Sequence, residues 1–173
     1  MAKDLGKIHV YTGGGKGKTT SSFGLALRAI GAGYKVYIIQ FLKGQNYSEL
    51  KTLRRMSGLS FRRFGQKSFI HKIAGPKDKV LAQQGLKWAG QIVISGKYDL
   101  VVLDEIFVAL FFKLIKESDI VNLIKKKPAV VELVLTGRYA PPKIIKLADY
   151  VTEMKEIKHP FKRGLMARRG IEN

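Results

Sequence analysis

Four short segments of the chain consist mainly of aliphatic, β-branched and aromatic residues, a pattern typical of strands buried on both faces of a sheet. They are Lys7–Tyr11, Lys35–Phe41, Asp99–Leu103 and Val130–Leu135. Tyr150–Ile157 is more polar and predicts a further strand at a sheet edge. A short strand is also expected around Leu59–Phe64.

Stretches with helical spacing separate these strands, and glycine or proline follows several of them. They are Lys18–Ala32, Lys77–Ser95, Ser118–Lys126 and Pro141–Leu147. This alternation predicts an α/β fold, with a mostly parallel sheet of five or six strands and helices on both faces. We find no internal repeat or low-complexity linker, so we expect residues 1–173 to form a single domain. Ligands of such sheets bind beyond the carboxyl ends of the strands.

A glycine-rich turn follows the first predicted strand and leads into a helix. Its residues are Thr12, Gly13, Gly14, Gly15, Lys16, Gly17, Lys18, Thr19 and Thr20. Glycines let successive backbone N–H groups converge on phosphate oxygens with no Cβ in the way. In such a loop Lys18 is expected to contact the phosphates and Thr19 to bind Mg²⁺. Thr12 stands where the usual pattern has its first glycine, and the alternative is a flexible loop without a special role.

An acidic pair, Asp104 and Glu105, follows the apolar run Leu100–Leu103. An apolar strand that ends in carboxylates commonly holds hydrated Mg²⁺ beside a phosphate loop. Asp104 is expected to reach the metal, and Glu105 to act as a base, a metal ligand or an acceptor for ribose hydroxyls. Alternatively, both carboxylates cap a helix that begins near Ile106.

Two arginines are further candidates for anion binding. Arg138 follows Thr136-Gly137 at the end of another predicted strand, where it could bind an anion through both guanidinium edges. Arg28 lies on the first predicted helix, two turns beyond the loop. For each arginine a solvent-exposed side chain is an equally good interpretation.

The charge is strongly positive, with 32 Lys and Arg against 13 Asp and Glu, a formal net charge of +19. Since 46% of the residues are hydrophobic, this charge does not indicate disorder. It indicates polyanionic partners, and the mixture of basic residues with Phe61, Phe64 and Phe69 in Lys51–Lys79 resembles a nucleic-acid-binding surface. The absence of cysteine excludes disulfides and thiolate chemistry. We expect a cytoplasmic protein without a membrane segment, because its longest apolar run, Ile106–Phe112, is too short to span a bilayer.

Several motifs together resemble the phosphate-loop type of ATP:corrinoid (cob(I)alamin) adenosyltransferase. They are TGGGKGKTTSSFGLALRAIGAG, VVLDE, LTGR, LADYVTEM and the closing KHPFKRGLMARRGIEN, in the family's order and spacing. The resemblance implies a P-loop NTPase-like (RecA-like) fold. It also implies transfer of the 5′-deoxyadenosyl group of ATP to a reduced Co(I) corrin, with release of intact triphosphate. Because cobalt is the nucleophile, the protein has to position C5′ and stabilise the leaving group.

The resemblance also assigns roles to individual residues. Gly13 to Thr20 match the family's loop, Arg28 its helix arginine, Glu105 an acid near the ribose or metal, and Arg138 the arginine of its T-G-R turn. The family removes the lower axial ligand of cobalt with an aromatic side chain, for which Phe69 is the candidate. ATP, Mg²⁺ (or Mn²⁺) and a corrinoid are the implied ligands, with an acidic electron donor such as a flavodoxin and a second copy of the chain as partners.

The sequence departs from the family at three places. Gly14 replaces a common asparagine, Ile106-Phe107-Val108 replaces a more polar segment, and an N-terminal extension found in some relatives is largely missing. The second hypothesis is a nucleic-acid-binding or nucleic-acid-stimulated P-loop ATPase, supported by the charge. A third is a nucleotide-binding protein that has lost its activity, suggested only by the departure at Phe107.

Overall fold

The computed structural model describes residues 4–45, 47–67 and 74–172. Within these ranges, six strands form one sheet in the order β3-β2-β4-β5-β1-β6. The strands are β1 (Ile8–Thr12), β2 (Val36–Phe41), β3 (Leu59–Phe64), β4 (Leu100–Asp104), β5 (Glu132–Thr136) and β6 (Tyr150–Glu153). All neighbouring strands pair in parallel. The predicted α/β fold is confirmed.

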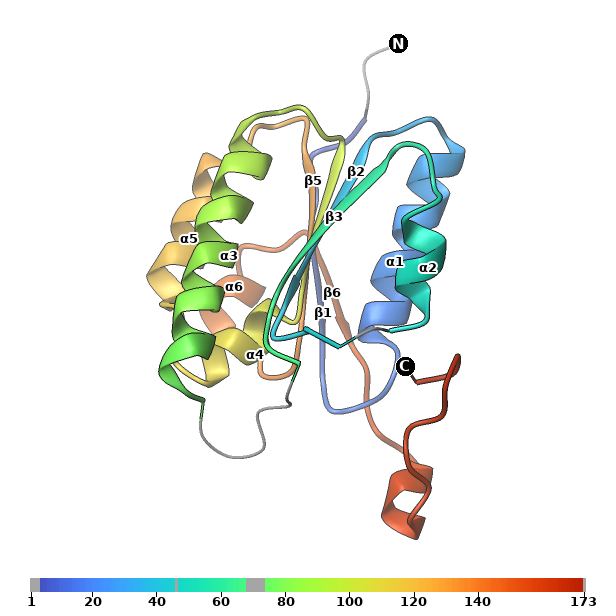
Figure 1. The fold of residues 1–173 in the computed structure, drawn as a ribbon. Helices are drawn as coiled ribbons and strands as arrows, with labels where there is room; N and C mark the ends of the chain where they lie inside the picture. Colours follow the sequence, from blue (N-terminus) through green and yellow to red (C-terminus); the bar gives the residue numbers. More distant parts are fainter. Residues whose placement is uncertain (1–3, 46, 68–73, 173) are drawn as a thin grey trace.

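Helices cover both faces of the sheet (Figure 1). The helix α1 (Lys18–Gly31) and the short α2 (Glu49–Leu53) lie on one face. The other face carries four helices, which are α3 (Pro76–Ile94), α4 (Ile106–Phe111), α5 (Glu117–Lys126) and α6 (Pro142–Ile145). A 3₁₀ turn, η1 (Pro160–Arg163), follows β6. Sequence reasoning missed α2, whose five residues are too few for a helical period to appear.

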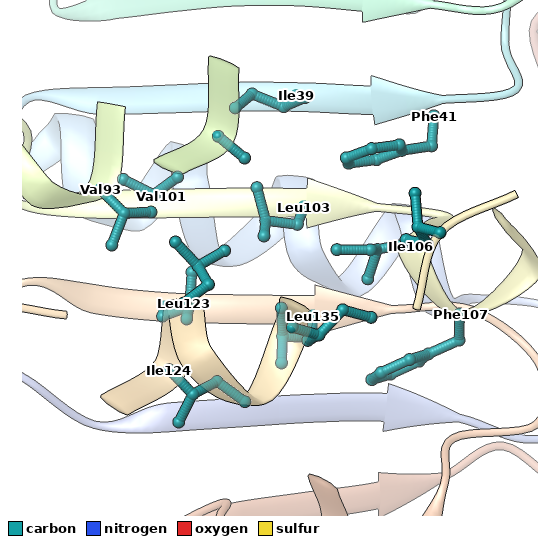
Figure 2. Close-up of a cluster of buried hydrophobic side chains, with 14 of the residues drawn as sticks. Ile39, Phe41, Val93, Val101, Leu103, Ile106, Phe107, Leu123, Ile124 and Leu135 are labelled. Carbon is teal, nitrogen blue, oxygen red and sulfur yellow. The ribbon is translucent and has the colours of Figure 1, made fainter. Parts of the chain in front are cut away.

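The central strands carry the core. All six residues of β2 and all five of β4 are buried, as expected for strands with helices on both sides. Figure 2 shows the larger part of this core, where side chains of β2, β4 and β5 meet Val93 of α3 and Leu123 and Ile124 of α5. Ile106 and Phe107 close the same cluster at the carboxyl end of the sheet.

The edge strand β6 is shorter than predicted. Tyr150–Ile157 was expected to be extended throughout, but the strand ends at Glu153. Beyond it, the chain leaves the sheet and crosses the glycine-rich loop, where Gly15 N donates to the Met154 carbonyl oxygen at 2.6 Å. Among the described strands it pairs with β1 alone, which confirms the expected position at a sheet edge.

The strand order brings the candidate motifs to one edge of the sheet. Because all strands are parallel, the ends of β1, β4 and β5 point the same way. The strand β5 lies between β1, which leads into the glycine-rich loop, and β4, which ends in Asp104. This order is consistent with the P-loop NTPase-like arrangement expected from the sequence.

Candidate nucleotide site

The glycine-rich loop is held against the segment that follows β6. Besides the bond from Gly15, Met154 N donates to the Thr12 carbonyl oxygen at 2.8 Å. A Cβ atom on Gly13 or Gly15 would lie 2.5 or 2.7 Å from the Met154 carbonyl oxygen, closer than real Cβ contacts. Gly13 also has a φ of +97°, in the region that favours glycine. Two of the glycines are therefore required by close backbone packing, in addition to any phosphate contact.

Gly14 differs from its neighbours because a Cβ there would meet no atom within 4 Å. It is exposed, and it lines the pocket described below. The open side of the loop is therefore at Gly14, and the packed side is at Gly13 and Gly15.

The side chain of Lys18 folds back over the loop. Its Nζ donates to the carbonyl oxygens of Gly13 at 2.8 Å and Gly15 at 2.7 Å. Burial lowers the pKa of Lys18, with Glu105 acting in the opposite direction. An ammonium has three N–H donors, so one remains for a ligand while two hold the loop in shape.

Asp104 is the centre of a buried polar cluster. The carboxylate has no exposed surface, and it accepts from Thr19 Oγ1 at 2.9 Å and Thr136 Oγ1 at 2.8 Å through Oδ1. Its Oδ2 accepts from Lys43 Nζ at 2.8 Å and Gln40 Nε2 at 3.1 Å. Burial alone would raise the pKa of Asp104, but the Lys43 charge and these hydrogen bonds hold it below its ordinary value. Asp104 is therefore ionised. Its hydrogen bonds join β4 to α1, β5, β2 and the segment that follows β2.

Lys43 and Thr136 are site residues that sequence reasoning missed. The Lys43 ammonium also donates to Thr19 Oγ1 at 3.0 Å, so it bridges the two residues that we predicted to bind a metal. Burial would lower the pKa of Lys43, but Asp104 and Glu105 outweigh it and raise the pKa. Its position could have indicated a role, because Lys43 follows β2 closely, at the carboxyl edge of the sheet where ligands bind.

Glu105 adopts a left-handed backbone conformation, with φ of 62°. Its N–H donates to Thr136 Oγ1 at 3.0 Å, which turns the chain away from Asp104 and into α4. Glu105 is the residue that precedes α4 but makes no side-chain cap bond, and Asp104 is used inside the cluster, so neither carboxylate caps the helix through a hydrogen bond. Burial and then the charge of Asp104 raise the pKa of Glu105.

The two candidate arginines differ in position. Arg138 is exposed, lines the same pocket as Glu105 and lies close enough to influence the pKa of both Glu105 and Lys18. Arg28 is exposed on α1 and does not line the pocket, and its charge acts on Tyr11 instead. Thr12 is buried, and its Oγ1 accepts from Ala140 N at 3.2 Å, tying the loop to the turn that carries Arg138. Phe69 lies outside the described residues.

A pocket of about 760 Å³ lies over the loop, within the size range of nucleotide and cofactor sites. Its walls come from the loop, the start of α1, Lys43, the segment Tyr47–Glu49, Glu105, Arg138 and the C-terminal tail. The tail reaches back from η1 and ends beside the loop, close to the start of α1 (Figure 1). There Glu172 Oε1 accepts from Lys16 Nζ at 2.8 Å and from Arg168 at 3.0 Å. The tail was recognised in the sequence only as part of the family resemblance, whereas in the structure it is a wall of the pocket.

The departure at Phe107 has a structural explanation. Ile106 and Phe107 are fully buried, and a Cβ on Gly137 would lie 2.9 Å from Phe107 Cβ. Phe107 therefore packs beneath the turn that carries Arg138. Most of Ile106–Phe112 is taken up by the core rather than left as an apolar surface, although Phe111 is exposed and stacks on Tyr139 with ring centroids 4.5 Å apart.

Among the described residues no helix is long and apolar enough to cross a membrane. Within the same part of the chain, no group of three or more His, Asp or Glu side chains is placed to hold a metal ion. A divalent cation at this site would therefore depend on phosphate oxygens for part of its coordination, as Mg²⁺ does at nucleotide sites.

These features define a phosphate-loop nucleotide-binding α/β protein. The loop follows β1, a buried carboxylate ends β4, and the strand between them carries the arginine turn.

Comparison with known proteins identifies the family. The family model for the ATP:corrinoid adenosyltransferases BtuR/CobO/CobP matches residues 4–173, and the chain belongs to this family of enzymes. The corrinoid adenosyltransferase of Pseudomonas aeruginosa is 35% identical, with 98% of this chain and 84% of that protein aligned. That of Escherichia coli is 31% identical, with 98% and 86% aligned. The corrinoid adenosyltransferase CobA of Salmonella typhimurium is 30% identical, with 98% and 87% aligned.

Proposed function

We propose that this chain transfers the 5′-deoxyadenosyl group of ATP to the cobalt of a reduced Co(I) corrinoid. The electron pair of cobalt forms the Co–C5′ bond, the C5′–O bond breaks, and its electron pair leaves with the triphosphate. Family membership supports this reaction. The structural observation that carries it is the pocket itself, where the loop, Lys18 and Arg138 surround one space, and where no hydrogen bond between a serine or threonine hydroxyl and a histidine is found among the described residues. The protein therefore works by positioning and by stabilising charge on the leaving group.

The triphosphate is assigned to the open side of the loop. Gly14 leaves space there, and Lys18 has one N–H that the loop carbonyls do not use. Arg138 faces the same pocket and provides a second positive charge. We assign Arg28 a supporting role at most, because it is exposed and does not line the pocket.

We assign the metal position to Thr19 and Asp104, with Glu105 beside them, and Mg²⁺ or Mn²⁺ as the ion. The donor set fits, because Thr19 Oγ1 and the Asp104 carboxylate are hard oxygen ligands only 2.9 Å apart. Gln40 Oε1 adds a buried oxygen without a hydrogen-bond partner in the described part of the chain. When bound, the metal neutralises negative charge that develops on the triphosphate. Thr136 and Gln40 keep the Asp104 carboxylate turned towards Thr19.

Other parts of the proposal rest on the family resemblance. Phe69 is the residue proposed to displace the lower axial ligand of cobalt. An acidic electron donor such as a flavodoxin would find a complementary surface on a chain of net charge +19. We further propose that the chain is one nucleotide-binding domain that acts as a homodimer in the cytoplasm, where ATP is available.

The nucleic-acid-binding alternative is not favoured. Besides the family assignment, two of the three aromatic residues that suggested it, Phe61 and Phe64, pack within the fold, and the third, Phe69, lies outside the described residues. Phe64 is buried, Phe61 packs against the core on the α1 face, and the Arg62 guanidinium lies 4.4 Å from the centre of the Trp88 ring. These rings are not available to stack on bases.

Incubation with ATP, Mg²⁺ and chemically reduced cobalamin tests the reaction. Adenosylated corrin and tripolyphosphate should appear in equal amounts, and Lys18→Met should lose most of this activity. Lys51→Met is the matched control, because it removes the same charge from the exposed surface of α2. Release of orthophosphate without adenosylated corrin would show that the chain is an ATPase instead.

A further inference from the structure

A lysine ammonium occupies the space between the two residues assigned to the metal. Lys43 Nζ lies 3.0 Å from Thr19 Oγ1 and 2.8 Å from Asp104 Oδ2, and both contacts are hydrogen bonds that the ammonium donates. The side chain is largely shielded, with 16% of its surface exposed, and Asp104 is completely buried. The buried carboxylate therefore has its neutralising cation within the protein itself.

Lys43 and a divalent ion compete for the Asp104 carboxylate. The two carboxylate oxygens have about four acceptor positions. All are used, because Oδ1 accepts from Thr19 and Thr136 and Oδ2 accepts from Lys43 and Gln40. Lys43 also takes one acceptor position of the Thr19 hydroxyl. A metal bound directly to Asp104 must therefore displace one of these donors, and Lys43 is the one whose positive charge repels the metal.

The pocket offers Lys43 another position. Lys43 itself lines the space assigned to the triphosphate, together with Lys18 and Arg138. Its ammonium lies over the Tyr47 ring, with Nζ 5.6 Å from the ring centre, and Tyr47 lines the same pocket. Phosphate oxygens there would provide the negative charge that Lys43 gives up when it leaves Asp104.

We propose that Lys43 is the resident cation of the nucleotide-free site, and that a divalent metal replaces it only when a triphosphate receives the ammonium. Metal and nucleotide then bind together, and the empty protein does not collect divalent ions at Asp104. Lys43 thus acts as a positioning residue for the adenosyl-transfer reaction. This inference rests on the metal assignment of the proposed function.

Titration of nucleotide-free protein with Mn²⁺, followed by electron paramagnetic resonance of the free ion, tests the proposal. Lys43→Met should bind Mn²⁺ more tightly than wild type by roughly tenfold or more, because a nearby positive charge has been removed. Lys51→Met, which removes a charge from the exposed surface nearby, should bind as wild type does. Adding Asp104→Asn to Lys43→Met should abolish the gain.

Thermal unfolding gives a second readout. Mn²⁺ should raise the Tm of Lys43→Met and leave that of wild type unchanged, because only in the variant does the Asp104 carboxylate lack a neutralising cation. If Lys43→Met does not fold, Lys43→Gln replaces it, since an amide can still donate to Asp104 but carries no charge. The same increase in Mn²⁺ affinity is expected of Lys43→Gln.

The inference and the metal assignment can fail separately. Equal Mn²⁺ affinities for the Lys43 and Lys51 variants would overturn the inference. In the presence of ATP, Thr19→Ala and Asp104→Asn should weaken Mn²⁺ binding, and unchanged binding in both would overturn the metal assignment itself.

Discussion

Replacing Thr136 with valine tests whether the buried cluster around Asp104 holds the site together. The hydroxyl donates to Asp104 Oδ1 at 2.8 Å and accepts from Glu105 N at 3.0 Å, and the residue has no exposed surface. Valine has nearly the same shape, so the change removes both hydrogen bonds with little effect on packing. A hydrogen bond to a charged group contributes about 1.5–3 kcal/mol, and an unsatisfied buried N–H costs about 1–3 kcal/mol.

We therefore expect Thr136→Val to lower the free energy of unfolding by ~3 kcal/mol. For a chain of this length, that corresponds to a decrease in Tm of roughly 6–12 °C. Urea denaturation and calorimetry provide the measurements. Thr136→Ser keeps the hydroxyl and should lose less than Thr136→Val.

Thr152→Val is the matched control, because Thr152 is also on a strand but is exposed on β6. It should change the free energy of unfolding by no more than ~0.5 kcal/mol. If Thr136→Val and Thr152→Val proved equally stable, the hydrogen bonds of Thr136 to Asp104 and Glu105 would not stabilise the fold.

Three further changes test separate parts of the site. Gly15→Ala would put a Cβ 2.7 Å from the Met154 carbonyl oxygen, and it should lower the free energy of unfolding, measured by urea denaturation, by ~2 kcal/mol. The Cβ of Gly14→Ala would meet no atom within 4 Å, so this change should lower it by less than ~0.5 kcal/mol. Equal losses of stability in Gly15→Ala and Gly14→Ala would show that close packing against Met154 does not require Gly15. Glu105→Gln, compared with wild type in EDTA, tests the pKa of Glu105, which burial raises above its ordinary value of 4.5. The folded state then binds the proton more tightly than the unfolded state, so wild-type stability falls as pH rises from 4.5 to the raised pKa. The variant should have the higher Tm above that interval and the same Tm below it, and a constant difference at every pH would rule this out. Glu172→Gln frees Lys16 and should tighten tripolyphosphate binding in calorimetry by up to about fivefold, as removal of an exposed ion pair allows. Asp119→Asn, which removes an exposed acid on α5 that does not line the pocket, should leave binding unchanged, and similar effects of the two changes would argue against competition at Lys16.

The sequence predicted the sheet well because its strands are buried on both faces and are almost wholly apolar. The predicted boundaries of the central strands differ from the observed ones by no more than two residues, and all six strands were expected. The predicted end of β6 was wrong because its alternation continues through Met154–Ile157, where the backbone is used by the loop instead of the sheet.

The candidate site was predicted less completely. Motif spacing identified the loop, Asp104 and Arg138, and the structure brings them to one edge of the sheet. Lys43 and Thr136 were missed, because a lysine after a strand usually faces solvent and a threonine in a strand has many uses. Their roles depend on which strands are neighbours, and only the order β2-β4-β5 places both beside Asp104. The assigned roles of the loop residues, Glu105 and Phe69 stay predictions.

The position of β1 in the sheet has a consequence for synthesis of the chain. Strand β1 leaves the ribosome before its partners β5 and β6, so it stays without these neighbours until the segment from Glu132 to Glu153 has emerged. The glycine-rich loop also requires the Met154 backbone to fix its shape. Contacts between such distant segments form late in folding. A chain that lacks β6 and Met154 therefore lacks the backbone bonds that hold the glycine-rich loop, so the shape of the proposed nucleotide site depends on a segment more than 130 residues further along the chain.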